Sequence, residues 1–279
     1  MRGMYICLNR GTTGGGLPLP EFVKLSADAG FAGADVDLGY AAKHGASALA
    51  DLYASHNQRF GGWGPPDWRG EAAKAQENLN QLKPLAKLAA ELKIDSAATW
   101  LMPSSDLPFL QNWNFHVQRL QPVAKVLAEH GLRLGLEYVA PYHLRRKFPH
   151  EFVFTTGQML ELADAIGPNV GLLVDCFHVH CAGDTMERVS QVPANKIVLA
   201  HLNDAPRVPV QQVEDGKRLL PGEGAIDIAG FLRALRKAGY KGPLSLEVFS
   251  EQLRALPPLD AAKRAWNATE KVLNEVNTH

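Results

Sequence analysis

The chain lacks three features that would narrow its class at once: a long apolar run, an excess of charge of one sign, and a cysteine framework. No run approaches the ~20 apolar residues of a membrane-spanning helix. The apolar stretch Met4–Leu8 is too short for a signal peptide, because Asn9 and Arg10 interrupt it. We therefore expect no membrane partner.

Charge and cysteine content exclude further classes. The 29 basic and 29 acidic side chains give a formal net charge of zero, so no overall basic field is expected to hold nucleic acid. The three cysteines, Cys7, Cys176 and Cys181, form no CxxC pair. An odd number without framework spacing suits a reducing compartment, which favours a cytoplasmic location.

The positive signal is an alternation of short apolar runs with amphipathic helical stretches, which predicts βα units and a parallel sheet. The 279 residues are normal for one (β/α)₈ barrel. We predict the α/β class, with a single TIM barrel over residues 1–279. Its first four strands are expected at Met4–Leu8, Ala34–Leu38, Arg59–Trp63 and Ser96–Leu101. Helices are expected at Pro20–Ala29, Ala46–Ala54, Glu71–Leu92, Trp113–Glu129, Thr156–Ala165, Asp227–Ala238 and Pro257–Val276.

The other four apolar runs each end on a residue type that binds metals. They are Leu132–Glu137, Val170–Asp175, Ile197–His201 and Leu244–Glu247. Side chains at the carboxyl ends of strands in one barrel converge on one face. Three carboxylates and one imidazole there predict a site for one divalent cation. Oxygen-rich ligation favours Mn²⁺, with Co²⁺ or Mg²⁺ as alternatives, and the histidine also admits Zn²⁺.

Five motifs within this half of the chain together resemble the xylose isomerase-like TIM barrels, above all the ketose 3-epimerases and inosose isomerases. They are LGLEYV, VDCFHVH, LAHLNDAPR, PGEG and LSLEVF, between Leu134 and Phe249. The resemblance implies that Glu137, Asp175, His201 and Glu247 are the metal ligands. It also implies that Glu137 and Glu247 are the acid/base pair, on opposite faces of a sugar. One would remove the proton beside a carbonyl, the other would return a proton, and the cation would stabilise the enediolate between them.

The resemblance also suggests residues that hold the substrate. His178 lies three residues after Asp175 and Arg207 six after His201, and both spacings match family positions that bind substrate oxygens near the metal. One departure concerns His143, which stands where the ketose 3-epimerases have a substrate-binding glutamate. This difference argues against a simple ketohexose 3-epimerase. It is compatible with a loop that recognises an acidic or larger substrate.

Two tryptophans are candidates from their positions alone. Trp63 and Trp100 lie at the ends of the third and fourth predicted strands and could stack on a sugar. It is equally consistent with the sequence that they pack in the core of the barrel. Asn203 and Asp204 are further polar candidates, and nothing in the sequence ranks them.

The expected activity is a metal-dependent isomerase or epimerase acting on a ketose, inosose or related keto-sugar. The alternative is a lyase or dehydratase on a keto-sugar, inosose or 3-keto-glycoside, because β-elimination uses the same metal and base. A DNA-repair endonuclease of the superfamily would need a histidine two residues after Asp215, where Lys217 stands. The expected partner is a small carbohydrate, and the sequence leaves a homo-oligomer open.

Overall fold

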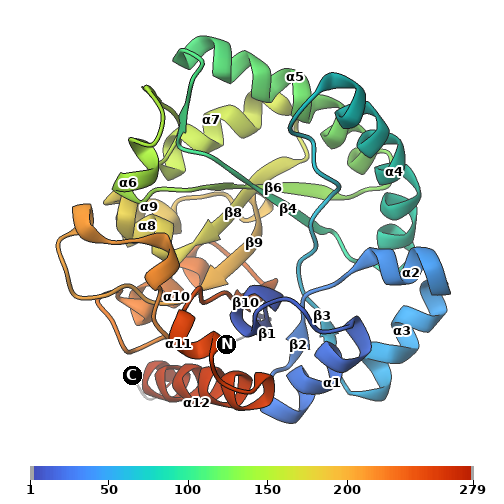
Figure 1. Cartoon of the computed structure of the whole chain (residues 1–279), viewed down its shortest axis with the longest axis vertical. Coiled ribbons are helices and arrows are strands. Elements are labelled where there is room, and N and C mark those ends of the chain that lie inside the picture. The colour runs from blue at the N-terminus through green and yellow to red at the C-terminus, as the bar shows by residue number, and fades with distance from the viewer. Residues whose placement is uncertain (1–2, 278–279) are drawn as a thin grey trace.

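The computed structural model describes residues 3–277 as a curled parallel sheet surrounded by helices (Figure 1). The ends of the predicted domain, residues 1–2 and 278–279, lie outside the described residues. The sheet has eight strands in the order β3-β2-β1-β10-β9-β8-β6-β4. A parallel bridge between Trp63 and Ala97 joins the segment after β3 to β4. This bridge connects the two edges of the sheet, so the strands form a closed barrel.

The strand positions follow the predicted pattern closely, except at the second and third strands. The eight strands are β1 (Tyr5–Leu8), β2 (Gly33–Ala34), β3 (Arg59–Phe60), β4 (Ser96–Leu101), β6 (Arg133–Tyr138), β8 (Val170–Asp175), β9 (Ile197–Leu202) and β10 (Pro243–Leu246). Every residue of β8, β9 and β10 is buried. Burial on both faces explains their continuous apolar sequences.

Helices cover the outside of the barrel (Figure 1). The longer helices are α1 (Leu19–Ala29), α2 (Leu38–His44), α3 (Ala46–Ser55), α4 (Ala72–Glu91), α5 (Phe109–Ala128), α7 (Thr156–Ile166), α10 (Ile228–Lys237) and α12 (Pro258–Asn277). The shorter ones are α6 (Tyr142–Arg145), α8 (Cys176–Ala182), α9 (Met186–Ser190) and α11 (Glu251–Arg254), with 3₁₀ turns at Arg10–Thr13, Ala194–Lys196, Val210–Gln212 and Asp215–Lys217. A two-stranded antiparallel ribbon pairs β5 (Ser104–Ser105) with β7 (His150–Glu151).

The second predicted strand is too long, and the structure shows why. Strand β2 ends at Ala34 rather than Leu38, because the chain turns into α2 four residues later. The side chain of Asp37 caps that helix by accepting a hydrogen bond of 2.8 Å from the Gly39 N–H. Asp35 therefore lies beyond the end of the strand, at the mouth of the barrel.

The packing of the core and the state of the cysteines are those of an ordinary barrel with a filled interior. The apolar side chains of the strands and of the inner helix faces form one cluster. The three cysteines are buried and unpaired. Within residues 3–277, no helix has both the length and the apolar character needed to cross a membrane.

Candidate metal centre

Four side chains from neighbouring strands meet at the carboxyl-end mouth of the barrel. Glu137 lies in β6, Asp175 ends β8, His201 lies in β9 and Glu247 directly follows β10. One ligand atom of each lies within 4.8 Å of the others. His201 Nδ1 is 3.4 Å from Glu247 Oε2, 3.5 Å from Glu137 Oε1 and 3.7 Å from Asp175 Oδ2. The structure thus brings together the four residues predicted from the strand ends.

Two atoms of this cluster fit the binding of a cation. Glu137 Oε1 and His201 Nδ1 are buried and have no hydrogen-bond partner among the described residues. A buried polar atom without a partner costs ~1–3 kcal/mol, and more if it is charged. A divalent cation bound to both atoms would remove that cost, and three carboxylates with one imidazole are a suitable donor set for it.

The electrostatics of the cluster combine the effect of burial with attraction between His201 and the carboxylates. Burial lowers the pKa of His201, but Glu247, Asp175 and Glu137 outweigh burial and hold that pKa well above its usual range. Burial raises the pKa of Glu137, and although His201 acts to lower it, the effect of burial is larger. A bound cation would compete with a proton for the imidazole of His201, because a histidine ligand binds a metal in its neutral form.

Arg218 is a component of the centre that the sequence analysis missed. Its side chain is 2% exposed, and Nη1 donates hydrogen bonds of 2.9 Å to Asp175 Oδ2 and to Glu247 Oε2. Nη2 donates to Asp215 Oδ1 at 2.8 Å. Burial works to raise the pKa of Asp175, yet the Arg218 guanidinium and His201 hold it well below its usual range. Arg218 therefore keeps two of the three carboxylic groups of the cluster ionised and fixed in place.

Asn203 supports the same carboxylate from the other side. Its amide nitrogen donates to Asp175 Oδ1 at 3.0 Å and to the Glu247 carbonyl oxygen at 3.2 Å. The Asn203 side chain is fully buried. It orients Asp175, as the outer partners of metal-binding groups commonly do.

Comparison with known families identifies the barrel. The family described as the xylose isomerase-like TIM barrel matches residues 23–272. The chain belongs to this family. Its predicted fold class and its predicted resemblance are thereby confirmed.

Curated relatives of this xylose isomerase-like barrel include isomerases and a dehydratase. An inosose isomerase of Halalkalibacterium halodurans is 31% identical over 160 residues, which are 57% of this chain and 54% of that protein. A 3-dehydroshikimate dehydratase of Pseudomonas aeruginosa is 33% identical over 140 residues, 50% of this chain and 21% of that protein. The chain spans about half the length, or less, of these curated relatives.

Solved structures match over nearly the whole chain. A xylose isomerase domain protein from Alicyclobacillus acidocaldarius subsp. acidocaldarius has a TM-score of 0.89 and 31% identity, and the match covers 98% of this chain and 99% of that one. The IolI protein with a bound zinc atom has a TM-score of 0.80 over 98% of this chain and 99% of that one. Its identity of 23% shows the fold alone.

Two predicted substrate residues lie away from the centre of this barrel. Arg207 is exposed, and among the described residues it makes no hydrogen bond or ion pair with the cluster. The loop after β9 carries the chain outward at Arg207 and returns it at Arg218, so the arginine that reaches the carboxylates comes later. His143 is exposed on α6. Its neighbour Leu144, rather than His143, lines a cavity at the mouth.

The other predicted substrate residues line two adjoining cavities. The "Arg218 cavity", of about 410 Å³, is lined by His178, Leu144, Asp215, Arg218 and Phe249 among others. The "Asp35 cavity", of about 260 Å³, is lined by Asn9, Arg10, Asp35, Trp63 and His201 among others. Trp100, Glu137 and Glu247 line both cavities, so the cluster lies where they meet.

His178 and Trp100 are placed to contact a molecule in these cavities. His178 Nδ1 accepts a 3.4 Å hydrogen bond from the Ala140 N–H, and its Nε2 lies 3.4 Å from Arg218 Nη2. The Trp100 side chain remains 45% exposed, although the Arg69 guanidinium lies 4.3 Å from its ring centroid. A large aromatic surface left open beside polar groups is a common platform for a sugar ring.

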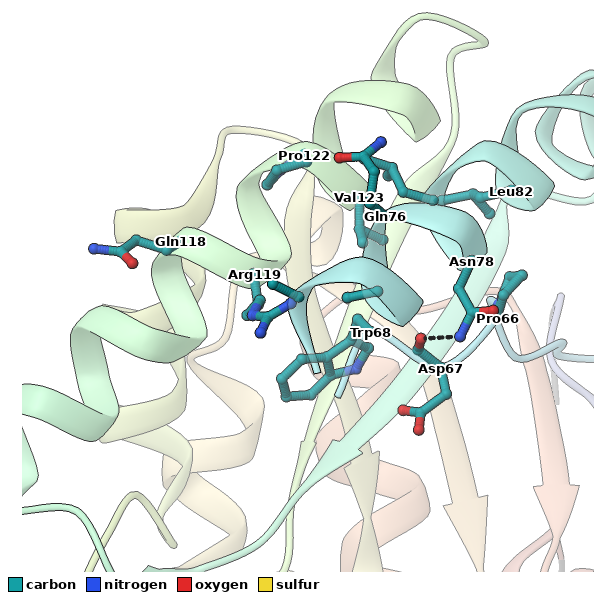
Figure 2. A pocket seen from close by; sticks show the side chains of 13 residues that line it. Pro66, Asp67, Trp68, Gln76, Asn78, Leu82, Gln118, Arg119, Pro122 and Val123 are labelled. Atoms are coloured by element: carbon teal, nitrogen blue, oxygen red, sulfur yellow. Dashed lines mark hydrogen bonds between the residues drawn. The ribbon is translucent and has the colours of Figure 1, made fainter. Parts of the chain in front are cut away.

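A further pocket lies outside the barrel mouth, between α4 and α5. Its volume is about 310 Å³, and its lining includes none of the four clustered residues. Figure 2 shows Trp68 at its base, with Gln118 and Arg119 on one side and Asn78 bound to the Asp67 carbonyl on the other. Trp68 Nε1 donates to Thr99 Oγ1 at 3.0 Å, which ties this outer wall to the strand that carries Trp100.

Proposed function

We propose that this protein is a divalent-metal-dependent isomerase or epimerase of a ketose, inosose or related keto-sugar. The observation that supports it most is the meeting of Glu137, Asp175, His201 and Glu247 within 4.8 Å at the mouth of the barrel. The residues fit one divalent cation, with Mn²⁺ favoured and Co²⁺, Mg²⁺ or Zn²⁺ as alternatives. When bound, such a cation would stabilise negative charge that develops on the oxygen of a substrate carbonyl.

The two glutamates are proposed to move the protons. Glu137 and Glu247 stand on β6 and after β10, two strands that β8 and β9 separate in the sheet. They therefore approach the space between the cavities from different parts of the barrel wall. One carboxylate would remove the proton from the carbon beside the carbonyl, and the other would return a proton to the neighbouring position or to the opposite face.

Arg218 and His178 are proposed to bind the reacting end of the substrate. Arg218 and His178 both line the Arg218 cavity with Glu247, and Arg218 Nη2 lies 3.4 Å from His178 Nε2. N–H groups there would donate to substrate oxygens and stabilise charge that forms as the proton leaves. Arg218, which reaches the cluster, is proposed here for the role predicted for Arg207, which is exposed.

A lyase is the second candidate, and the similarity to a 3-dehydroshikimate dehydratase favours it. Removal of the same proton would be followed by loss of a hydroxyl or glycosyl group from the next carbon. The glutamate that returns a proton in isomerisation would then protonate the leaving group.

Solvent exchange tests the proposal and separates the two reactions. The metal-loaded protein is incubated in D₂O with ketoses, inososes and 3-keto-glycosides, and NMR follows the carbon beside the carbonyl. Deuterium incorporation with an intact carbon skeleton and substituents supports isomerisation, whereas a new double bond with a released group supports elimination. Protein treated with a chelator is the control. Neither change in any substrate with the metal-loaded protein would contradict the proposed chemistry.

Three wider expectations are proposals of the same kind. The whole chain would act as one catalytic unit, located in the cytoplasm, with a small carbohydrate as its substrate. Its relatives process such compounds, and its buried cysteines are unpaired.

A further inference from the structure

The chain beyond strand β10 runs past the end of its partner β1 at the point where Glu247 stands. The two strands lie side by side (Figure 1), and Leu8, the last residue of β1, pairs with Leu246. After Leu8 the chain leaves the sheet and enters the 3₁₀ turn Arg10–Thr13. Strand β1 therefore does not continue beside the backbone of Glu247 and Val248. Because Val248 is fully buried, its N–H needs another acceptor.

The hydroxyl of Thr12 provides that acceptor. Thr12 is fully buried. Its Oγ1 accepts a hydrogen bond of 3.0 Å from the Val248 N–H and donates one of 2.6 Å to the Leu246 carbonyl oxygen. Leu246 and Val248 are the two neighbours of Glu247 in the chain. One hydroxyl therefore holds the peptide groups on both sides of Glu247.

Thr12 is itself held in place by the loop after β1. The Asn9 N–H donates to the Leu246 carbonyl oxygen at 3.2 Å, and the Thr12 N–H donates to the Asn9 carbonyl oxygen at 3.1 Å. A Cβ atom on Gly11 would lie 2.8 Å from Phe249 Cε1, so the loop packs directly on that ring. The protein alone thus fixes the position of the hydroxyl.

The other hydrogen bonds of the Glu247 backbone involve β9 and the residue after it. The Glu247 N–H donates to the Leu202 carbonyl oxygen at 3.1 Å, and the Glu247 carbonyl oxygen accepts from Asn203 Nδ2 at 3.2 Å. Asn203 also contacts Asp175 of the cluster, whereas Thr12 lines neither the Asp35 cavity nor the Arg218 cavity. Any effect of the Thr12 hydroxyl on the centre therefore passes through the backbone at Glu247.

We propose that Thr12 is a positioning residue, whose hydroxyl fixes the backbone from which the Glu247 carboxylate reaches the cation and the substrate. A group of a working site has to be held within about 0.5 Å of its productive position. Without the hydroxyl the buried Val248 N–H has no acceptor, which is costly, and the chain around Glu247 relaxes to another position. The inference rests on the proposed function and adds to it a residue that touches neither cation nor substrate.

Three variants separate positioning from a merely structural role. Thr12→Val keeps the shape of the side chain and removes the hydroxyl, whereas Thr12→Ser keeps the hydroxyl. Thr269→Val is the matched control, because Thr269 is also fully buried and its hydroxyl donates at 2.8 Å to the Ala265 carbonyl oxygen within α12. Both valine variants should lower the denaturant midpoint of the metal-free protein.

The first measurement is Mn²⁺ affinity by calorimetric titration of the metal-free proteins, with no substrate present. We expect Thr12→Val to weaken Mn²⁺ binding by about tenfold, the scale seen when an outer partner of a metal ligand is lost. Thr12→Ser and Thr269→Val should bind Mn²⁺ as the wild type does. A loss of stability alone would not produce this difference between the two valine variants.

The second measurement is deuterium exchange at saturating Mn²⁺, on the keto-sugar that exchanges fastest with the wild type. We expect Thr12→Val to lower kcat by roughly 10- to 100-fold, because a small misplacement of a reacting group is enough for that loss. KM should stay close to that of the wild type, since Thr12 lines neither cavity. Thr12→Ser should restore most of the rate. If Thr12→Val does not fold, Thr12→Ala takes its place with the same expectations.

Two outcomes would overturn the role of Thr12. One is Mn²⁺ affinity and exchange in Thr12→Val equal to those in Thr269→Val, which would show that the hydroxyl supports the fold alone. The other is a loss in Thr12→Ser as large as that in Thr12→Val. Both leave the proposed function standing if the wild type exchanges. A wild type that binds Mn²⁺ and exchanges no keto-sugar contradicts the proposed function instead, and the Mn²⁺ affinities then decide the role of Thr12; a wild type that binds no Mn²⁺ contradicts both.

Discussion

At the scale of single residues, the sequence predicted the groups whose position is set by a strand end. Glu137, Asp175, His201 and Glu247 each follow an apolar run, and the barrel brings such positions together. Arg218 could not be found in this way, because it lies in a long loop whose path no periodicity fixes. The one available signal was its place before the Pro221–Gly222 turn, and an arginine there would usually be a solvated loop cation.

The two loop arginines provide a matched pair of variants. Arg218→Lys keeps the charge but loses the planar fork that reaches Asp175, Glu247 and Asp215 together. We expect kcat/KM to fall by ~10–100-fold, as for other outer partners of metal-binding groups. Arg207→Lys should leave kcat and KM close to the wild type, because Arg207 is exposed. The reverse ranking in steady-state kinetics would restore Arg207 to the site.

At the scale of elements, the loop after β9 is organised by a buried carboxylate. The sequence leaves Asp204 as an unranked polar candidate. In the structure its side chain binds the backbone of the loop. Its oxygens accept backbone hydrogen bonds from Ala205, Gly222, Gly224 and Ile226 at 2.8 to 3.0 Å. This ring of donors returns the chain toward the barrel, which allows Arg218 to enter the centre.

Two glycines of this loop differ in the space around them. A Cβ atom on Gly224 would lie 2.1 Å from the Ala205 carbonyl oxygen and 2.5 Å from Asp204 Oδ1, whereas one on Gly216 would meet nothing within 4 Å. We expect Gly224→Ala to lower the free energy of unfolding by ~1–3 kcal/mol and to reduce activity with it. Gly216→Ala should change neither quantity in denaturant titrations and rate assays. A fully stable, active Gly224→Ala variant would mean that the Asp204 contacts do not hold the loop.

The early elements of the chain were the least well predicted. Strands β2 and β3 have two residues each, where five were expected. Short strands carry little periodic signal, and the cap at Asp37 diverts the chain before the predicted end.

At the scale of the whole molecule, the barrel gathers three carboxylates and a histidine in its interior, and a cation would stabilise the folded chain. A ligand at 100 times its dissociation constant adds ~2.7 kcal/mol to the free energy of unfolding. For a chain of this size that corresponds to a rise in Tm of roughly 5 °C. We expect this rise on addition of Mn²⁺ in a thermal melt, and its loss in His201→Gln.

The matched control for that melt is His44→Gln, since His44 is exposed on α2. It should retain the response of the wild type to Mn²⁺. An equal rise in Tm for the wild type and for His201→Gln would show that the cation binds elsewhere.

The account depends on proton transfer by two glutamates at one metal centre, and deuterium exchange in the glutamine variants tests it most directly. Glu137→Gln and Glu247→Gln, compared with the exposed Glu223→Gln, are given the keto-sugar that exchanges fastest with the wild type. Metal content is measured in the same samples. Loss of exchange by at least ~10²-fold in both Glu137→Gln and Glu247→Gln, with Glu223→Gln unaffected, is the predicted result. Exchange at the wild-type rate in either of these two cluster variants, with metal bound, would contradict the account.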